Sequence, residues 1–584
     1  MIVPMKKIHL IVQKKDVAAA LENLAGLGLV HIEHCQIPEG KPVECARETV
    51  EILDQVLAIL SPIKDKKQAE RCGDWKEKAT EILDLQALIT QHKEFIDKRT
   101  KRIETWEAWG DFEPQDIRDL AKCGVFVQLY EVPASVKNVE VSAGAVLQEI
   151  GKAKGFTRYV CIKEGDENLP YDRVYPPPVS LSNLKLLQAE EETELGQLNK
   201  LLWEETTYFE QLKKIRDAAQ YELDIKSAEA GMYDYDRLCF LKGFIPEDHL
   251  LDLQTYAKKQ EWGVLVEDPE EGDDVPTKLK NKEWVNLSKP AFDLIEILPG
   301  YSEVDISPVF LVFFTLFFAM LIGDAAYGMI FGLLTAFVQV KFGKKIPDKT
   351  PFFLMYLLTG FCIVFGVLTG TYFGQAWLPD SIQPVVPWLN ETKNIQLVCF
   401  VVAVIHLTIA RLWAFKQKTP SILALAEIGW LLVVWGMFFV ANYFVLGYAM
   451  PRFAVPMIGI GAALALFFMA PPWELPKKIG QEAIPFLLGI IGAGTDIVSY
   501  IRLFAVGVAT VAVADAANSM WGVASLGVFS YVLFIFLHLL NMVLALMAIL
   551  VHAVRLNVLE FSGHLGLEWA GVKYQPLQKT LQEA

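Results

Sequence analysis

Arg502 lies near the middle of an apolar stretch that runs from Pro485 to Met520. About 20 apolar residues suffice to cross a bilayer as a helix. A guanidinium at that depth costs ~3 kcal/mol on insertion scales and marks a functional site by default. Arginine cannot release its proton to escape this cost. The next apolar segment, residues 526–561, offers few carboxylates at that depth. We therefore expect the counter-charge to come from another subunit.

Other polar residues form two stripes on the last two apolar segments. In the first segment Asp496, Ser499 and Arg502 recur every three residues, next to Tyr500. In the second segment four polar residues fall within an arc of about 100° on a helical wheel: His538, Asn541, His552 and Arg555. Polar residues on facing helices suit the walls of an aqueous path for an ion.

Further candidates lie toward the ends of these segments. Thr510, Asp515 and Asn518 follow Arg502, and Glu560 follows Arg555. Asp515 and Asn518 are candidates for an outer mouth, and Glu560 is a candidate for an inner mouth. Arg555 and Glu560 could instead anchor the helix at the interface. His538 and His406 could be hydrogen-bonded packing residues between helices, and Asp324 could cap a helix that begins after it.

Composition limits the class of protein. The chain has 584 residues, is 53% hydrophobic and carries a net charge of -15, mostly in its first half, which disfavours nucleic acid as a partner. Its eight cysteines form no CxxC pair or zinc spacing, so we expect reduced thiols and no metal site. The N-terminus has no signal-peptide pattern. No GxxxxGK[ST] loop occurs, and we expect no bound cofactor.

The first half predicts α/β lobes joined by helices. Strands are expected at 7–13, 28–34, 237–244 and 262–267, with helices at 16–27 and 246–259, which would form one split ferredoxin-like lobe. Strands at 125–131 and 157–162, with a helix around 145–154, predict a second lobe. The acidic run 267–274 is interpreted as a solvated linker into the membrane.

Heptad-like repeats connect the two lobes. Apolar residues recur every seven positions from Trp75 to Ile103, and a 3–4 pattern runs from Leu195 to Leu223. The predicted domains are a cytosolic dumbbell, residues 1–300, and a transmembrane domain, residues 301–584. The dumbbell comprises a proximal lobe (1–40 and 233–300), an antiparallel coiled-coil hairpin (44–110 and 180–232) and a distal lobe (111–179). An ordinary helical bundle is the alternative for the hairpin.

The second half predicts an α-helical membrane domain of about eight spans: 307–323, 325–340, 351–376, 395–413, 422–446, 453–470, 483–520 and 524–561. With a cytosolic N-terminus, the inside loops hold nine basic residues: Lys341, Lys344, Lys345, Lys349, Arg411, Lys416, Lys418, Lys477 and Lys478. The outside loops hold Lys393 and Arg452, so the N- and C-termini are both expected in the cytosol. The last two spans exceed the ~30 Å hydrocarbon core, which predicts strong tilt.

Two arginine motifs resemble a known family. Ser499–Ala505 (SYIRLFA) and His552–Phe561 (HAVRLNVLEF) are similar to signature segments of subunit a of rotary V-type ATPases, called subunit I in bacteria and archaea. The resemblance extends over the chain through weaker matches: residues 6–8, 28–33, 241–246, 323–328, 370–374 and 405–406. Thr510 and Ala545 stand where a His and a Glu are expected in vacuolar members.

The resemblance implies a stator that forms ion half-channels against a rotating proteolipid (c/K) ring. Arg502 would face the ion-carrying carboxylate of the ring, and Arg555 would be the second arginine of the site. The implied partners are peripheral stalk subunits (E/G type) at the lobes, the central-stalk socket and the bilayer, which would be a prokaryotic plasma membrane. ATP would be handled by other subunits.

Two other classes remain open. A secondary transporter or channel with a cytosolic domain would favour inverted repeats, and no correspondence between halves is visible here. A membrane-anchored coiled-coil tether would not need Arg502. The coupling ion, H⁺ or Na⁺, is not determined by this sequence, because the residues near Arg502 do not provide the oxygen cage that a hard cation prefers.

Overall fold

A computed structural model describes residues 1–64, 66–67, 73–133, 136, 144–153, 155–270, 272–344, 346, 348–374, 384–521 and 527–579. Cys72, Lys345 and the predicted start of the last span at 524–526 lie outside these residues. The chain divides into two compact units. The membrane-helix unit comprises residues 1–8, 244–260 and 264–575. The mixed unit comprises residues 9–243, residues 261–263 and the chain from Pro576 onward.

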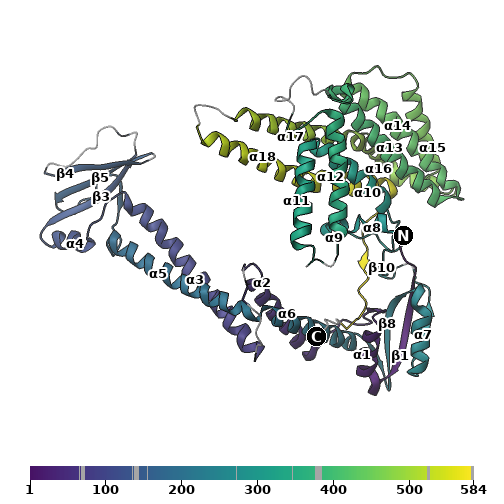
Figure 1. The fold of residues 1–584 in the computed structure, drawn as a ribbon, viewed down its shortest axis with the longest axis horizontal. Helices are drawn as coiled ribbons and strands as arrows, with labels where there is room; N and C mark the ends of the chain where they lie inside the picture. Colours follow the sequence, from purple (N-terminus) through teal and green to yellow (C-terminus); the bar gives the residue numbers. More distant parts are fainter. Residues whose placement is uncertain are drawn as a thin grey trace. The chain divides into compact units, whose positions relative to one another are not determined.

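The first sheet has the strand order β2–β8–β1–β9, with β7 paired to β8 (Figure 1). Its strands are β1 (Met5–Gln13), β2 (His31–Glu33), β7 (Tyr233–Tyr235), β8 (Leu238–Pro246) and β9 (Gly263–Glu267). Helix α1 (Val17–Leu27) ends at Gly28, whose φ of 64° is the left-handed conformation that favours glycine. Helix α7 (Leu250–Lys259) follows β8 and precedes β9 along the chain. These elements confirm the strands and helices predicted around both ends of the first half.

The second sheet corrects one prediction. Its order is β4–β5–β3–β6, built from β3 (Val125–Pro133), β4 (Val146–Ala153), β5 (Phe156–Glu164) and β6 (Asp172–Val174). The helix expected around 145–154 is strand β4, paired antiparallel with β5. Gly155, with φ of 96°, lies in the turn of this hairpin. The register shift between Glu149 and Gly151 interrupts the alternation that would have identified the strand. Helix α4 (Pro114–Lys122) precedes β3.

Four helices of the mixed unit share one apolar cluster: α2 (Lys41–Leu60), α3 (Trp75–Glu107), α5 (Leu181–Glu205) and α6 (Phe209–Ala230). Helix α3 packs on α5, and α2 packs on α6 (Figure 1). The heptad positions Ile82, Ile89 and Leu202 are buried in their shared apolar cluster. The heptad-like repeats therefore do bury apolar side chains. The antiparallel coiled-coil hairpin stays a prediction.

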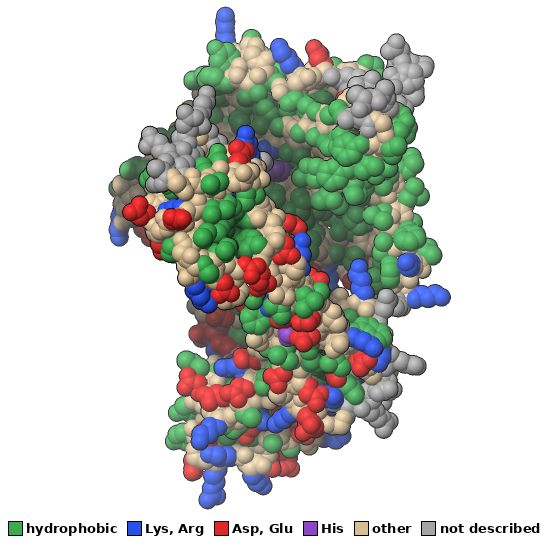
Figure 2. Space-filling view, turned by 90° about the vertical axis from the view of Figure 1, so that its left-hand side faces the viewer, with side chains coloured by type: hydrophobic (Ala, Val, Ile, Leu, Met, Phe, Trp, Pro, Cys, Tyr) green, Lys and Arg blue, Asp and Glu red, His purple; other side chains and the backbone are tan. Residues whose placement is uncertain are grey.

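The membrane-helix unit contains a series of apolar helices. They are α10 (Ser307–Ile322), α11 (Ala325–Phe342), α12 (Thr350–Thr369), α13 (Thr392–Lys418), α14 (Leu425–Ala441), α15 (Ala454–Phe467), α16 (Leu475–Ser499), α17 (Ile501–Ser519) and α18 (Phe529–Ala548). Among the residues described, six helical segments are long and apolar enough to cross a membrane: 325–342, 350–369, 392–418, 422–446, 475–519 and 529–565. Helices α10 and α15 are apolar but shorter. Figure 2 shows apolar side chains covering much of the visible face of these helices.

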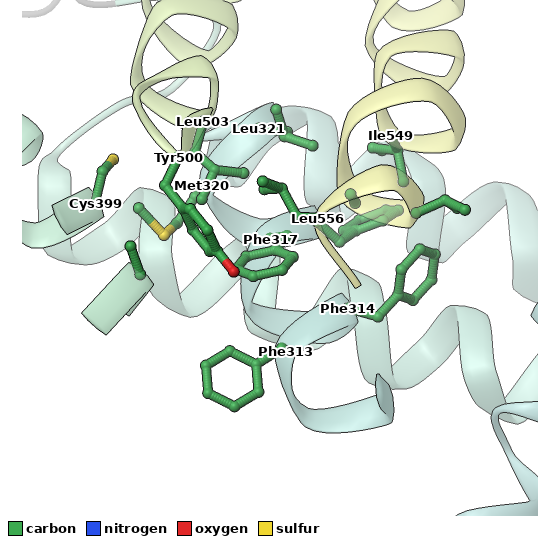
Figure 3. Close-up of a cluster of buried hydrophobic side chains, with 14 of the residues drawn as sticks. Phe313, Phe314, Phe317, Met320, Leu321, Cys399, Tyr500, Leu503, Ile549 and Leu556 are labelled. Atoms are coloured by element: carbon green, nitrogen blue, oxygen red, sulfur yellow. The ribbon is translucent and has the colours of Figure 1, made fainter. Parts of the chain in front are cut away.

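The core of this unit is rich in aromatic side chains. Phe317 of α10 lies beside Tyr500, as Figure 3 shows, and Phe313, Leu503 and Leu556 belong to the same cluster. Tyr500 and Phe317 meet edge to face with ring centroids 5.9 Å apart. Because this cluster joins the first apolar helix to the last two, it fixes where the Arg502 segment lies in the unit.

The chain between the first sheet and α10 is more ordered than a solvated linker. Lys7 Nζ lies 2.8 Å from Asp273 Oδ2, and both side chains are about one-tenth exposed. Strand β10 (Pro276–Thr277) then pairs in parallel with β11 (Val572–Lys573), and α8 (Glu283–Asn286) and α9 (Lys289–Ile295) follow. The acidic run is thus anchored at Asp273 by an ion pair, which net charge along the sequence does not reveal.

Candidate functional site

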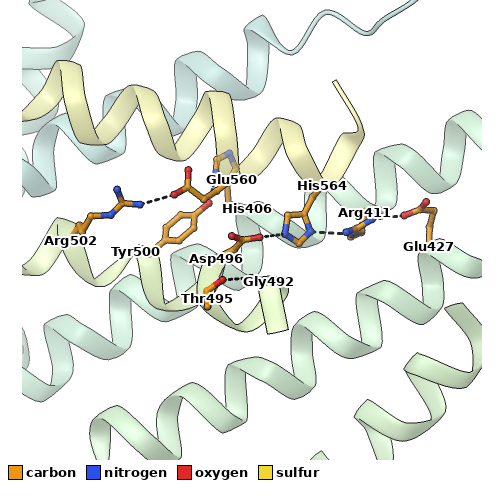
Figure 4. Close-up of polar contacts among 10 residues, drawn as sticks. All are labelled: His406, Arg411, Glu427, Gly492, Thr495, Asp496, Tyr500, Arg502, Glu560 and His564. Carbon is orange, nitrogen blue, oxygen red and sulfur yellow. Dashed lines mark hydrogen bonds and ion pairs between the residues drawn. The ribbon is translucent and has the colours of Figure 1, made fainter. Parts of the chain in front are cut away.

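Arg502 lies in the first turn of α17, just after a break in the helix. Helix α16 ends at Ser499, and Tyr500 separates it from α17. The side chain turns back so that Arg502 Nε donates to the Ser499 carbonyl at 2.9 Å. Its Nη2 donates to Glu560 Oε1 at 2.6 Å, as Figure 4 shows. Ser499 therefore contributes its carbonyl oxygen to the site.

Glu560 supplies the counter-charge within the same chain. Its side chain is only 4% exposed, and Oε1 also lies 3.4 Å from Arg555 Nε. The expectation that the counter-charge comes from another subunit is therefore wrong, because one of the few carboxylates of this segment meets Arg502. That segment leaves α-helical geometry in two π-helical stretches, η8 (Ile549–Ala553) and η9 (Leu556–Phe561). A wheel drawn at α-helical spacing therefore misplaces Glu560.

A buried histidine joins the Arg502 segment to the Glu560 segment. His406 of α13 is fully buried, and its Nδ1 lies 2.8 Å from the Tyr500 hydroxyl. Its ring stacks on Phe313 at 3.8 Å and on Phe561 at 4.4 Å between centroids. Tyr500 and Phe561 are close in sequence to Arg502 and Glu560, so this contact holds both ends of the ion pair in place. The interpretation of His406 as a hydrogen-bonded packing residue is confirmed.

A second chain of polar contacts begins at Asp496 (Figure 4). His564 Nε2 lies 2.9 Å from Asp496 Oδ2, and Arg411 Nε donates to His564 Nδ1 at 3.0 Å. Because an Arg nitrogen only donates, Nδ1 is the acceptor and Nε2 carries the proton that goes to Asp496. Arg411 also donates to Glu427 at 3.0 Å, and Lys418 donates to the same carboxylate at 2.5 Å.

Sequence reasoning did not select Arg411, Glu427 or His564. Arg411 and Glu427 lie within segments long and apolar enough to span a membrane. The criterion applied to Arg502, an ionisable residue in an apolar span, would have selected both. His564 follows the last predicted span, and only its contacts with Arg411 and Asp496 identify it.

A separate polar cluster surrounds Tyr327 of α11. The Tyr327 hydroxyl lies 2.6 Å from His538 Nδ1 and accepts from Asn541 Nδ2 at 3.1 Å. Asn541 also donates to the Thr510 carbonyl at 2.8 Å, and His538 Nε2 lies 3.2 Å from Asn518 Oδ1. His538 thus makes the interhelical hydrogen bonds that its packing interpretation required.

Asp324 lies next to the Tyr327 cluster and is held by backbone hydrogen bonds. Its Oδ1 accepts from the backbone N–H groups of Ala326 and Tyr327, which confirms the predicted cap of α11. Its Oδ2 accepts from Gly374 N at 2.9 Å. A Cβ added at Gly374 would lie 2.2 Å from Asp515 Oδ1, so Asp515 borders the same loop.

The predicted site residues therefore fall into two groups. Asp496, Ser499, Tyr500, Glu560 and Arg555 lie with Arg502, whereas Thr510, Asp515, Asn518, His538 and Asn541 lie with Tyr327. Within the part of the chain that the structure describes, the Nδ1 atom of His552 is buried and has no hydrogen-bond partner in either group. The two polar stripes predicted from the sequence thus separate into two clusters.

An apolar cavity of about 530 Å³ opens beside Arg502. Side chains of α14 and of π-helix η6 (Asn442–Leu446) form one wall, and α16 forms the other. Arg502 is 23% exposed at its side chain and lines this cavity, while Glu560 is buried behind it. The guanidinium therefore keeps one accessible face on a largely apolar surface.

Comparison with known proteins finds relatives that align with the whole chain. No family model matches it. It is 29% identical to V-type ATP synthase subunit I of Borreliella burgdorferi, over 99% of this chain and 100% of the relative. It is 28% identical to V-type ATP synthase subunit I 1 of Treponema pallidum over the same shares. Over its full length the chain is thus similar to subunit I of V-type ATP synthases.

More distant relatives also align. An A-type ATP synthase subunit I of Pyrococcus abyssi is 26% identical over 79% of this chain and 71% of the relative. Among solved structures, the cytoplasmic N-terminal domain of subunit I, a homologue of V-ATPase subunit a, matches 45% of this chain and 99% of that chain, at 13% identity and a TM-score of 0.24. The similarity to subunit I therefore rests on the sequence matches alone.

Proposed function

We propose that this chain is the membrane stator subunit of a rotary V/A-type ATP synthase and forms the ion path against a rotating proteolipid ring. The observation that carries the proposal is the Arg502–Glu560 ion pair, in which Arg502 keeps a face on a cavity. Full-length similarity to subunit I supports the same assignment. ATP would be hydrolysed or made by other subunits of the complex.

The proposed mechanism follows from the charge on Arg502. A ring carboxylate that carries a proton or Na⁺ is neutral and is tolerated in lipid. Close to Arg502 the fixed positive charge favours its ionised form, so the ion is released. The same charge repels a cation that would pass directly between the two half-channels. During this step the ring carboxylate would share Arg502 with Glu560, which prevents a permanent bond to either group.

The two polar clusters suggest where the half-channels lie. We assign the cluster of Tyr327, His538 and Asn541, with Asp515 and Asn518, to the outer path. We assign Glu560 and Arg555, with the chain from Asp496 to Lys418, to the inner path. Thr510 and Asn541 would line the approach to Arg502 from the outer side. His552 would lie on the ring-facing side of the last helix.

The rest of the chain would keep the ion path stationary relative to the rotating ring. We propose eight spans, the six long segments together with the shorter helices α10 and α15, which returns both termini to the cytosol. Residues 1–300 would brace peripheral stalk subunits of the E/G type and meet the central-stalk socket. The coiled-coil hairpin would transmit that bracing, and the membrane would be a prokaryotic plasma membrane.

The test is purification of the complex from its native membrane. An affinity tag on this chain is expected to copurify a small, very hydrophobic ring subunit together with ATPase activity. Vesicles containing that complex should take up ions when ATP is added. A chain that purifies alone and transports a solute without ATP would instead be a secondary transporter.

A further inference from the structure

A pocket of about 180 Å³ lies beside the start of the first apolar helix, α10. It is enclosed by the β10–β11 pair and by the segment that contains α8 and α9. Three lysines line it: Lys278, Lys289 and Lys573. The one carboxylate in its lining, Asp293, has Oδ2 3.8 Å from Lys289 Nζ. The pocket wall therefore carries an excess of two positive charges.

Thr277 gives an independent indication that this pocket takes a ligand. The residue is 3% exposed, and its hydroxyl Oγ1 is a buried atom without a hydrogen-bond partner in the part of the chain that the structure describes. Leaving a buried hydroxyl unpaired costs about 1–3 kcal/mol. Because Thr277 lines the pocket, a ligand with acceptor oxygens would satisfy this hydroxyl and the lysines together.

The surroundings favour a membrane lipid as the source of those oxygens. Ser307, the first residue of α10, lines the pocket, so the pocket lies where the chain enters its apolar helices. Trp284 of α8 and Leu294 of α9 are 52% and 67% exposed, and Val312 of α10 is 56% exposed. Tryptophan beside exposed aliphatic side chains is typical of the membrane–water interface.

We propose that this pocket binds the phosphate group of an anionic membrane phospholipid. The ammonium groups of Lys289 and Lys573 would neutralise the phosphate, and the Thr277 hydroxyl would donate to one of its oxygens. Lys278 lies 4.9 Å from the centre of the Tyr574 ring and would add charge from the pocket wall. The acyl chains would extend along the exposed side of α10 near Val312. Such a lipid would hold the first residues of α10 at the membrane surface. This role does not depend on the Arg502 site.

The experiment measures binding of short-chain phosphatidylglycerol to the delipidated full-length chain in detergent, by native mass spectrometry. Thr277→Val and the double variant Lys289→Gln with Lys573→Gln remove the proposed contacts. Each should bind about tenfold more weakly than the wild type, because each loses hydrogen bonds to a charged group. Lys282→Gln, a nearby lysine that does not line the pocket, is the matched control and should bind like the wild type.

Two further arms separate the lipid from a soluble anion and from misfolding. Phosphatidylglycerol is expected to raise the melting temperature of the wild type, and inorganic phosphate is expected to compete only at much higher concentration. Equal stabilisation by inorganic phosphate, with none added by the lipid, would overturn the lipid assignment. Equal lipid binding by the wild type and both variants would overturn the site. Melting in phosphatidylcholine alone verifies that each variant folds; if Thr277→Val does not, the double lysine variant decides.

Discussion

Arg502 Nη2 and Glu560 Oε1 lie 2.6 Å apart, and they come from two different apolar segments of the chain. This pair solves the problem that a guanidinium creates in a membrane, because its positive charge is balanced within the same subunit. It also leaves Arg502 partly accessible, since the carboxylate is 4% exposed and the arginine side chain is 23% exposed. In the proposed function, a carboxylate of the ring that approaches Arg502 would therefore compete with Glu560 for the guanidinium.

Replacement of Arg502 by alanine is expected to abolish ATP-coupled ion transport, by a factor on the order of a hundred or more, while the complex still assembles. The apolar seam of α17 does not depend on this side chain, so assembly should persist. Arg502→Lys should fail as well, because an ammonium does not reproduce the planar fork that contacts both Ser499 and Glu560. Ion uptake by vesicles containing the purified complex measures both variants, and near-normal uptake by the alanine variant would contradict the proposal.

The pair should also show strong energetic coupling. Arg502→Ala and Glu560→Gln are each expected to lower the stability of the chain by about 3 kcal/mol, because each removes one partner of the buried pair. After Arg502→Ala, Glu560 keeps only the longer contact with Arg555, at 3.4 Å. The double variant should be no less stable than the single ones. Thermal unfolding of all four proteins gives the coupling energy. The exposed pair Glu94–Lys98 is a control with an expected coupling of about 0.3–0.5 kcal/mol, and similar values at both sites would argue against a buried pair.

Much of this arrangement could be predicted from the sequence, because its signals are local. An arginine within an apolar segment identified Arg502, and an aspartate before an apolar helix identified the Asp324 cap. The strands of the first sheet followed from apolar runs between turn residues. Each of these inferences needs only the residues within a few positions.

Other features depend on geometry that residue spacing does not encode. Glu560 reaches Arg502 through a π-helical segment, whereas a regular helix was assumed. The segment of strand β4 was predicted as a helix because the register shift at Glu149 interrupts its alternation. Only its pairing with β5 identifies it as a strand. His564 was missed because its partners Asp496 and Arg411 are distant in sequence.

The contact between Tyr500 and His406 should position the site. Tyr500→Phe keeps the ring but leaves His406 Nδ1 without its partner, and it should cost about 1–3 kcal/mol of stability and slow coupled transport. Changing both residues to phenylalanine should recover part of the stability, since neither side chain then has an unpaired polar atom. Unfolding and vesicle uptake are measured on the same preparations. A Tyr500→Phe protein indistinguishable from the wild type in both assays would exclude a positioning role.

Cysteine labelling tests the topology. Cys362 and Cys399 are fully buried in α12 and α13 and should not react with polar thiol reagents in intact membranes. Single cysteines introduced at Lys344 and Lys416 should react only from the cytosolic side, and one at Arg452 only from outside. Labelling of Lys416→Cys from outside would reverse the orientation that the loop charges favour.

Close packing of α14 on α15 leads to the final prediction. A Cβ added at Gly429 would lie 2.4 Å from Ala465 N and 2.6 Å from the Gly461 carbonyl oxygen, so the two backbones would have to separate. At Gly459, on the same α15 helix, a Cβ would meet no atom within 4 Å. Gly429→Ala should therefore destabilise the membrane-helix unit, by about 1–3 kcal/mol from overpacking.

Gly459→Ala is the matched control and should be neutral or slightly stabilising, because alanine favours a helix by about 0.8–1.0 kcal/mol over glycine. Thermal unfolding of the two purified variants in one detergent provides the comparison. Equal melting temperatures would mean that α14 and α15 do not approach as closely as the Gly429–Gly461 contact requires. A lower melting temperature for Gly429→Ala alone would locate the strain in this helix crossing, away from the Arg502–Glu560 pair.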